Sequence, residues 1–189
     1  MRETELLRSL RSVRRFAATP VPDDVLADVL EVARWTGSAK NRQPWELVVV
    51  KSRETLERLS RLGRFAGHVA GAPLALVLLM DGSSGSANVL FDEGRLAERI
   101  TVAAWAHGVG SCIATLFPKE NVRAAGELLG LPDHLSARTV ISLGYPADEN
   151  ARFLRSTPLL RAVVPIGRKP LSELVSWERY GSSRAKRGD

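Results

Sequence analysis

The feature that most constrains the fold is a continuous apolar run at residues 74–80, with the sequence Leu-Ala-Leu-Val-Leu-Leu-Met. A strand with one face in solvent alternates apolar and polar residues, so an uninterrupted run of this length indicates a β-strand buried on both faces. Extending the run back to Ala72 takes in Pro73 and still leaves it far short of the roughly 20 residues that cross a bilayer. We therefore expect a core strand and no membrane association.

Helical and strand-like patterns alternate along the rest of the chain, and turn residues separate them. The expected helices lie at residues 3–10, between Pro22 and Gly37, after a cap at Ser52, at about 91–107 and at about 119–129. The expected strands lie at residues 47–50, 74–80, 139–143 and 162–166. Residues 81–88 are rich in Gly and Ser and predict a solvent-exposed connection.

Length and composition favour one globular domain over residues 1–189, with residues 181–189 as a flexible basic tail. The apolar fraction of 44% and the charged fraction of 25% are ordinary for a soluble protein. A single cysteine, Cys112, and a charged segment at residues 1–5 in place of a signal peptide favour the cytoplasm. The three histidines show no metal-ligand spacing, so we expect no metal site.

The net charge of +6 raises the question of nucleic-acid binding. Much of the excess lies near the two ends of the chain, and positive and negative charges alternate between them. No zinc-ligand spacing or aromatic RNA-binding strand accompanies the charge, so we expect no nucleic-acid partner. A basic nucleic-acid-binding domain remains an alternative that rests on charge alone.

Two polar segments are candidates for ligand binding. Residues 11–16, Arg-Ser-Val-Arg-Arg-Phe, form the first, which we call the arginine turn; three guanidinium groups and a hydroxyl can neutralise a phosphate, although a solvated basic helix end has the same composition. The second, Ser-Ala-Lys-Asn-Arg-Gln-Pro-Trp at 38–45, leads straight into an apolar strand. Its residues 38–43, which we call the polar loop, need partners for their side chains, and water or a flat polar ligand can supply them.

Two further segments are weaker candidates. Gly108-Val109-Gly110-Ser111 follows the long helix and leads into a short apolar run, so its backbone N–H groups can approach a planar ring. The default interpretation is a plain helix stop, and the pattern does not match the dinucleotide-binding fingerprint. The basic residues that follow the last strand-like run, Arg168 and Lys169, can return to the phosphate that the arginine turn would hold.

In combination these segments resemble the nitroreductase family of FMN-dependent oxidoreductases. Residues 11–14 are similar to the family's Arg-Ser-x-Arg motif, and residues 38–45 to its Ser-x-x-Asn-x-Gln-Pro-Trp motif. Further matches follow in the family's order: the helix that begins near Asp92, the Gly-x-Gly-Ser turn at 108–111, Leu131-Pro132, residues 143–146 and residues 168–179. The likeness covers nearly the whole chain. Leu10 stands where many members have arginine, and the loop between Met80 and Phe91 is short where many members insert a lid.

The resemblance implies an α+β fold of three layers, in which helices flank a central mixed sheet, and an intertwined homodimer that exchanges C-terminal strands. It implies FMN at the subunit interface, with NAD(P)H as the reductant in a ping-pong reaction on nitro, quinone or enone-like acceptors. No side chain need act as nucleophile or general base, so we name no catalytic residue. The implied cofactor-binding residues are Arg11, Ser12, Arg14 and Arg168, with Thr115 and Leu116 approaching flavin N5, and Ser38, Asn41 and Gln43 covering the flavin from the other subunit.

An alternative from another class is a flavin-binding protein without turnover, acting as a sensor or store. The short loop before Phe91 and the leucine at position 10 motivate it.

Overall fold

The computed structural model describes residues 3–83, 88–148 and 167–182. The chain divides into two compact units, Met1–Leu154 and Arg155–Asp189. The expectation of one domain over residues 1–189 stays a prediction. The expected strand at 162–166 and the expected tail beyond residue 182 lie outside the described residues.

The first unit is built on a sheet of four strands in the order β1-β2-β4-β3. Each neighbouring pair is antiparallel. The strands are β1 (Trp45–Val50), β2 (Leu74–Asp81), β3 (Gly110–Thr115) and β4 (Leu135–Gly144). A mixed sheet was expected, whereas the four described strands pair in antiparallel fashion. The parallel pairing among the described residues is the isolated bridge between Ser12 and Ser111. β1 and β3 form the two edges of the described sheet.

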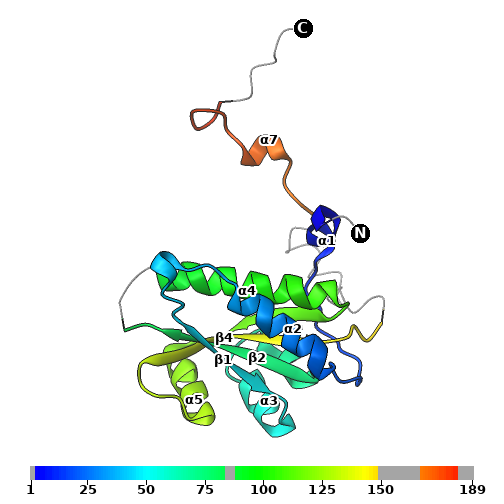
Figure 1. Cartoon of the computed structure of the whole chain (residues 1–189), viewed down its shortest axis with the longest axis vertical. Helices are drawn as coiled ribbons and strands as arrows, with labels where there is room; N and C mark the ends of the chain where they lie inside the picture. Colours follow the sequence, from blue (N-terminus) through cyan, green and yellow to red (C-terminus); the bar gives the residue numbers. More distant parts are fainter. Residues whose placement is uncertain (1–2, 84–87, 149–166, 183–189) are drawn as a thin grey trace. The chain divides into compact units, whose positions relative to one another are not determined.

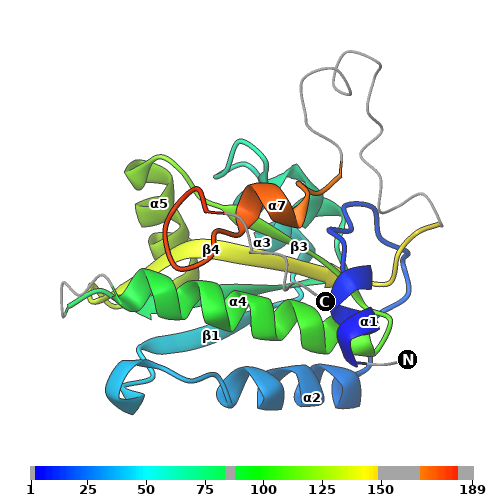
Figure 2. The same cartoon turned by 90° about the horizontal axis from the view of Figure 1, so that it is seen from above.

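Both faces of the sheet are covered by helices (Figures 1 and 2). Alternate residues of β2 enter two separate apolar clusters, which confirms the predicted strand that is buried on both faces. One cluster packs α2 (Asp23–Arg34) and α4 (Asn88–Ala106) on the sheet. The other packs α3 (Arg53–Ser60), η2 (Ala66–Gly71) and α5 (Lys119–Leu129) on the opposite face. The predicted three-layer α+β fold is therefore confirmed.

Local sequence explains where most of these elements begin and end. The hydroxyl of Ser52 accepts a hydrogen bond from the N–H of Thr55 and caps α3, as its position predicts. Helix α5 covers the predicted residues, and Gly130 caps it. β3 departs from the expectation of a plain helix stop followed by a short apolar run, because after Gly110 the chain forms a strand paired with β4.

The N-terminal helix α1 (Glu3–Ser9) is attached to the C-terminal half of α4. The indole N–H of Trp105 donates to the hydroxyl of Ser9 at 2.8 Å. Leu10 and Val13 pack in the same small cluster as Trp105. No helix among the described residues is long and apolar enough to cross a membrane.

Candidate functional site

The arginine turn is fastened to the edge strand β3. Ser12 pairs with Ser111 in a parallel bridge, and the N–H of Val13 donates to the carbonyl of Ser111 at 2.8 Å. Val13 is fully buried and Phe16 is half-buried, so both anchor the turn as the sequence predicted. A Cβ atom at Gly110 would lie 2.6 Å from the side chain of Val13, so this close approach requires glycine.

The three arginines of the turn have different surroundings. Arg15 forms an ion pair with Asp148 at 2.8 Å. The guanidinium of Arg11 is exposed and donates to the carbonyl oxygens of Arg8 and Leu10 at 2.6 and 2.7 Å. Arg14 is half-buried, and its charge acts on His68 and Cys112. Arg11 and Arg14, rather than Arg15, therefore remain the candidates for holding a phosphate.

Beneath the turn lies a polar cluster that the sequence did not reveal. His68 Nδ1 is 2.7 Å from the hydroxyl of Ser142, and that hydroxyl donates to the carbonyl of Cys112. A hydroxyl has one proton, so Nδ1 is the protonated nitrogen and Nε2 the acceptor. Nε2 is buried and has no hydrogen-bond partner among the described residues. Burial and the charge of Arg14 lower the pKa of His68 to about 4, so the ring is neutral at pH 7.

The far end of β3 presents the predicted backbone contacts. The N–H of Leu116 donates to the carbonyl of Arg138 at 2.7 Å, so this amide is already used. That bond makes Thr115 and Thr139 a non-hydrogen-bonded pair, in which the backbone N–H of Thr115 points away from β4, on the edge where Gly63 lies against the carbonyl of Thr115. Of the two predicted residues, Thr115 is therefore the one whose amide can meet a ligand. Ser111 and Thr115 are about 13 Å apart along the strand.

The polar loop satisfies several of its own groups. The hydroxyl of Ser38 accepts the backbone N–H of Gln43 at 2.8 Å, and the Gln43 amide donates to Asn41 Oδ1 at 3.2 Å. Lys40, Asn41 and Gln43 all have positive φ, at 54°, 53° and 49°. Non-glycine residues rarely adopt this backbone conformation, and it clusters at binding sites. The loop thus holds a strained, defined shape with its amide side chains exposed.

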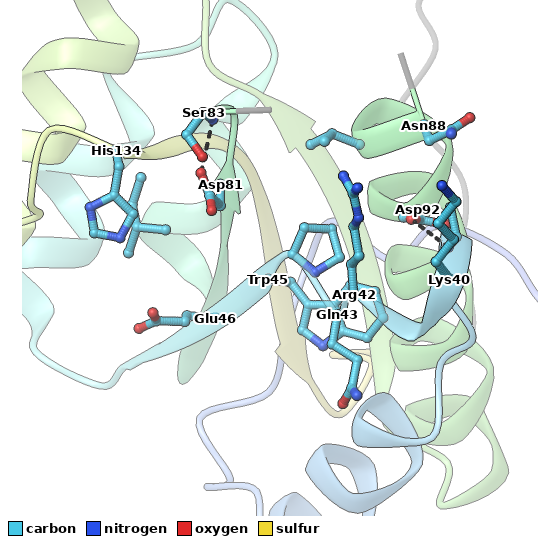
Figure 3. Close-up of a pocket in the computed structure, with 14 residues that line it drawn as sticks. Lys40, Arg42, Gln43, Trp45, Glu46, Asp81, Ser83, Asn88, Asp92 and His134 are labelled. Atoms are coloured by element: carbon cyan, nitrogen blue, oxygen red, sulfur yellow. Dashed lines mark hydrogen bonds between the residues drawn. The ribbon is translucent and has the colours of Figure 1, made fainter. Parts of the chain in front are cut away.

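The same loop docks on the first turns of α4. The N–H of Ala39 donates to Asp92 Oδ2 at 3.3 Å, and Asp92 lies 3.6 Å from Arg95. Asp92 is buried, so it is an anchor rather than a surface charge. A polar pocket of about 570 Å³ lies between the loop, the end of β2 and the start of α4. Figure 3 shows Arg42 and Trp45 between Asp81 on one side and Asp92 on the other.

The arginine turn and the polar loop lie at opposite ends of α4 (Figure 2). The turn follows α1, which contacts Trp105, whereas the loop contacts Asp92. Thirteen residues of α-helix separate these two contacts, a distance of about 20 Å. Within one chain, therefore, the structure does not bring Arg11, Ser12 and Arg14 together with Ser38, Asn41 and Gln43.

Arg168 belongs to the second unit. Its guanidinium is exposed and donates to the carbonyl of Gly167 at 3.1 Å. Its predicted return to a phosphate stays a prediction. Among the residues that the structure describes, no three His, Cys, Asp or Glu side chains are grouped so that they can hold a metal ion.

Fold and site together define a three-layer α+β protein that carries an arginine turn on the edge strand of its sheet. A sequence model of the nitroreductase family matches residues 7–65. An Archaeoglobus fulgidus protein with the provisional name NADH dehydrogenase/NAD(P)H nitroreductase is 32% identical, over 77% of this chain and 86% of its own. The NADH dehydrogenase of Thermus thermophilus is 30% identical, over 88% and 91%. The chain belongs to the nitroreductase family, as its sequence motifs predicted.

Solved structures agree with this assignment. A nitroreductase family protein from Clostridium difficile 630 is 26% identical and superposes with a TM-score of 0.75, over 95% of this chain and 99% of its own. An FMN-dependent nitroreductase from Clostridium difficile R20291 is also 26% identical, with a TM-score of 0.72 over 79% and 91%.

Proposed function

We propose that this protein is an FMN-dependent oxidoreductase that uses NAD(P)H to reduce nitro, quinone or enone-like acceptors. The observation that carries the proposal is the edge of β3, which has the arginine turn at its start and the outward amide of Thr115 at its end. Relatives named NADH dehydrogenase and FMN-dependent nitroreductase support the same chemistry.

The residues along this edge suit FMN. Arg11 and Arg14 supply the cations that a phosphate requires, and Ser12 adds a hydroxyl beside them. The outward N–H of Thr115 can donate to a ring nitrogen. FMN would supply the hydride chemistry when bound, and these residues would hold its phosphate and its ring. We expect the nicotinamide and the acceptor to react in turn, in a ping-pong order.

The polar loop enters the site only from a second copy of the chain. In a two-fold dimer that places two α4 helices antiparallel, the loop of one copy comes to the arginine turn of the other. The outer face of α4 suits such contact, since Leu90 and Phe91 are exposed and a groove of about 650 Å³ runs from them to Leu7. In the second unit, α7 (Leu171–Leu174) and the residues after it carry exposed apolar side chains, as expected of an arm that covers a partner. Strand exchange, a cytoplasmic location and the absence of a nucleic-acid partner remain predictions.

The visible spectrum of the purified protein, recorded before and after anaerobic addition of NADH or NADPH, tests the proposal. We expect a yellow protein whose flavin band bleaches with at least one nicotinamide and returns when a quinone is added. A yellow protein that neither nicotinamide bleaches is a flavin-binding protein without turnover, the alternative function. Protein that stays colourless after incubation with FMN contradicts both.

A further inference from the structure

A second cation lies near the far end of β3. Arg138 of β4 accepts the N–H of Leu116 through its carbonyl oxygen, so it neighbours the proposed Thr115 contact. The register between β2 and β4 shifts at this point, between the partners of Leu78 and Met80. The guanidinium of Arg138 reaches Glu93 of α4, with Nη2 at 3.2 Å from Oε2. The charged group therefore lies on the α4 side of the sheet, as does Thr139, the partner of Thr115.

Glu93 fixes this guanidinium. The glutamate side chain is 4% exposed, and its Oε1 has no hydrogen-bond partner among the described residues. A buried carboxylate needs a paired cation, because removing that cation leaves an uncompensated charge. The need of Glu93 for a cation thus holds the guanidinium of Arg138 in one place.

The arginine itself remains open to ligands. Its side chain is 47% exposed, and among the described residues the bond to Glu93 is the hydrogen bond that its guanidinium makes. A guanidinium carries five N–H donors, so most of its fork can still receive a carboxylate or a phosphate.

We propose that Arg138 binds the anionic group of the molecule that docks on the flavin, and that Glu93 is its positioning residue. This inference rests on the proposed function. The chemistry recognised is an oxyanion, which two sources can bring: the phosphates of the nicotinamide nucleotide or a carboxylate on the acceptor. The pair belongs to none of the sequence motifs.

Equilibrium titration of the oxidised, FMN-loaded protein with benzoate and with inorganic phosphate, followed by the flavin spectrum, tests the proposal without turnover. Arg138→Gln is expected to weaken binding of at least one of these anions roughly ten- to a hundredfold, the value of a charge-assisted hydrogen bond. Arg123→Gln on the exposed face of α5 is the matched control and is expected to leave both affinities unchanged.

The KM values of steady-state turnover distinguish the two sources of the anion. A raised KM for NADH or NADPH in Arg138→Gln identifies the nucleotide phosphates. A raised KM for para-nitrobenzoate, with that for neutral nitrobenzene unchanged, identifies an acceptor carboxylate. Glu93→Gln is expected to raise the same KM with little change in kcat for nitrobenzene, a split that a purely structural role does not produce.

Stability measurements separate binding from folding. Arg138→Gln strands the Glu93 charge and is expected to lower Tm, and adding Glu93→Gln is expected to restore Tm but not anion affinity. If FMN-loaded Arg138→Gln shows unchanged anion affinities and unchanged KM values for nicotinamide and acceptor, this inference is overturned and the proposed function is not. Protein that takes up no FMN overturns the proposed function, and this inference with it.

Discussion

Individual residues show how polar groups are accommodated at the edges of this core. Ser38 and Gln43 bond to each other across the polar loop, so the segment reaches β1 without depending on a ligand for every group. The sequence predicted that these side chains need partners, but not that the loop supplies some of them itself. Leu10, where many family members have arginine, packs with Val13 and Trp105 and thereby helps hold the arginine turn.

His68 makes stability depend on pH. The pKa of His68 is lowered from 6.5 to about 4 in the folded protein. Between these two pH values the unfolded chain binds a proton at His68 and the folded chain does not. The free energy of unfolding should therefore fall as the pH drops from 6.5 toward 4, and His68 should contribute no further change above 6.5. The comparison of urea denaturation at several pH values with that of His68→Gln isolates this contribution, and the variant should show a flatter dependence. If the free energy of unfolding changed equally with pH in the two proteins, the lowered pKa of His68 would be contradicted.

At the scale of elements, β3 connects the two ends of the proposed flavin contact. It begins at Gly110, where the arginine turn crosses, and ends at Thr115, whose amide faces outward. A single strand therefore sets the spacing between the arginine turn, which we propose holds the phosphate, and the proposed ring contact at Thr115.

Replacing Gly110 tests this role of β3. Gly110→Ala places a Cβ atom 2.6 Å from Val13, so the turn must move, and we expect a lower Tm together with weaker FMN binding. Gly126→Ala in α5 is the matched control, because its nearest atom is 4.0 Å away. Better helix propensity should stabilise that control by about 0.5–1 kcal/mol. Unaltered FMN affinity in Gly110→Ala would separate the turn from the flavin site.

The sequence predicted the elements that have a strong apolar pattern. Helices α2, α3 and α5 follow from apolar residues at the helical period, and strands β1, β2 and β4 follow from short continuous apolar runs. β3 was not predicted as a strand, since its Gly110 and Ser111 read as the end of the preceding helix. The pairs Arg138–Glu93 and His68–Ser142 join residues 45 and 74 positions apart, and no local pattern encodes such contacts.

At the scale of the whole molecule, α4 separates the two halves of the predicted site. The family motifs identified both halves from the sequence, but the roughly 20 Å between them follows only from the folded helix. This separation gives the predicted dimer a geometric reason, because one chain cannot place its own polar loop on its own arginine turn.

Subunit complementation tests this central claim most directly. One variant, Arg11→Gln/Arg14→Gln, loses the arginine turn's cations, and another, Ser38→Ala/Asn41→Gly, loses the polar loop's contacts. We expect each alone to bind FMN weakly, and we expect hybrid dimers, formed by co-expression with two different affinity tags, to recover one tight site per dimer. Only a site shared between copies gives this result, since neither chain of the hybrid carries both halves intact. Hybrid dimers that form but bind FMN no better than the parent variants would contradict the account.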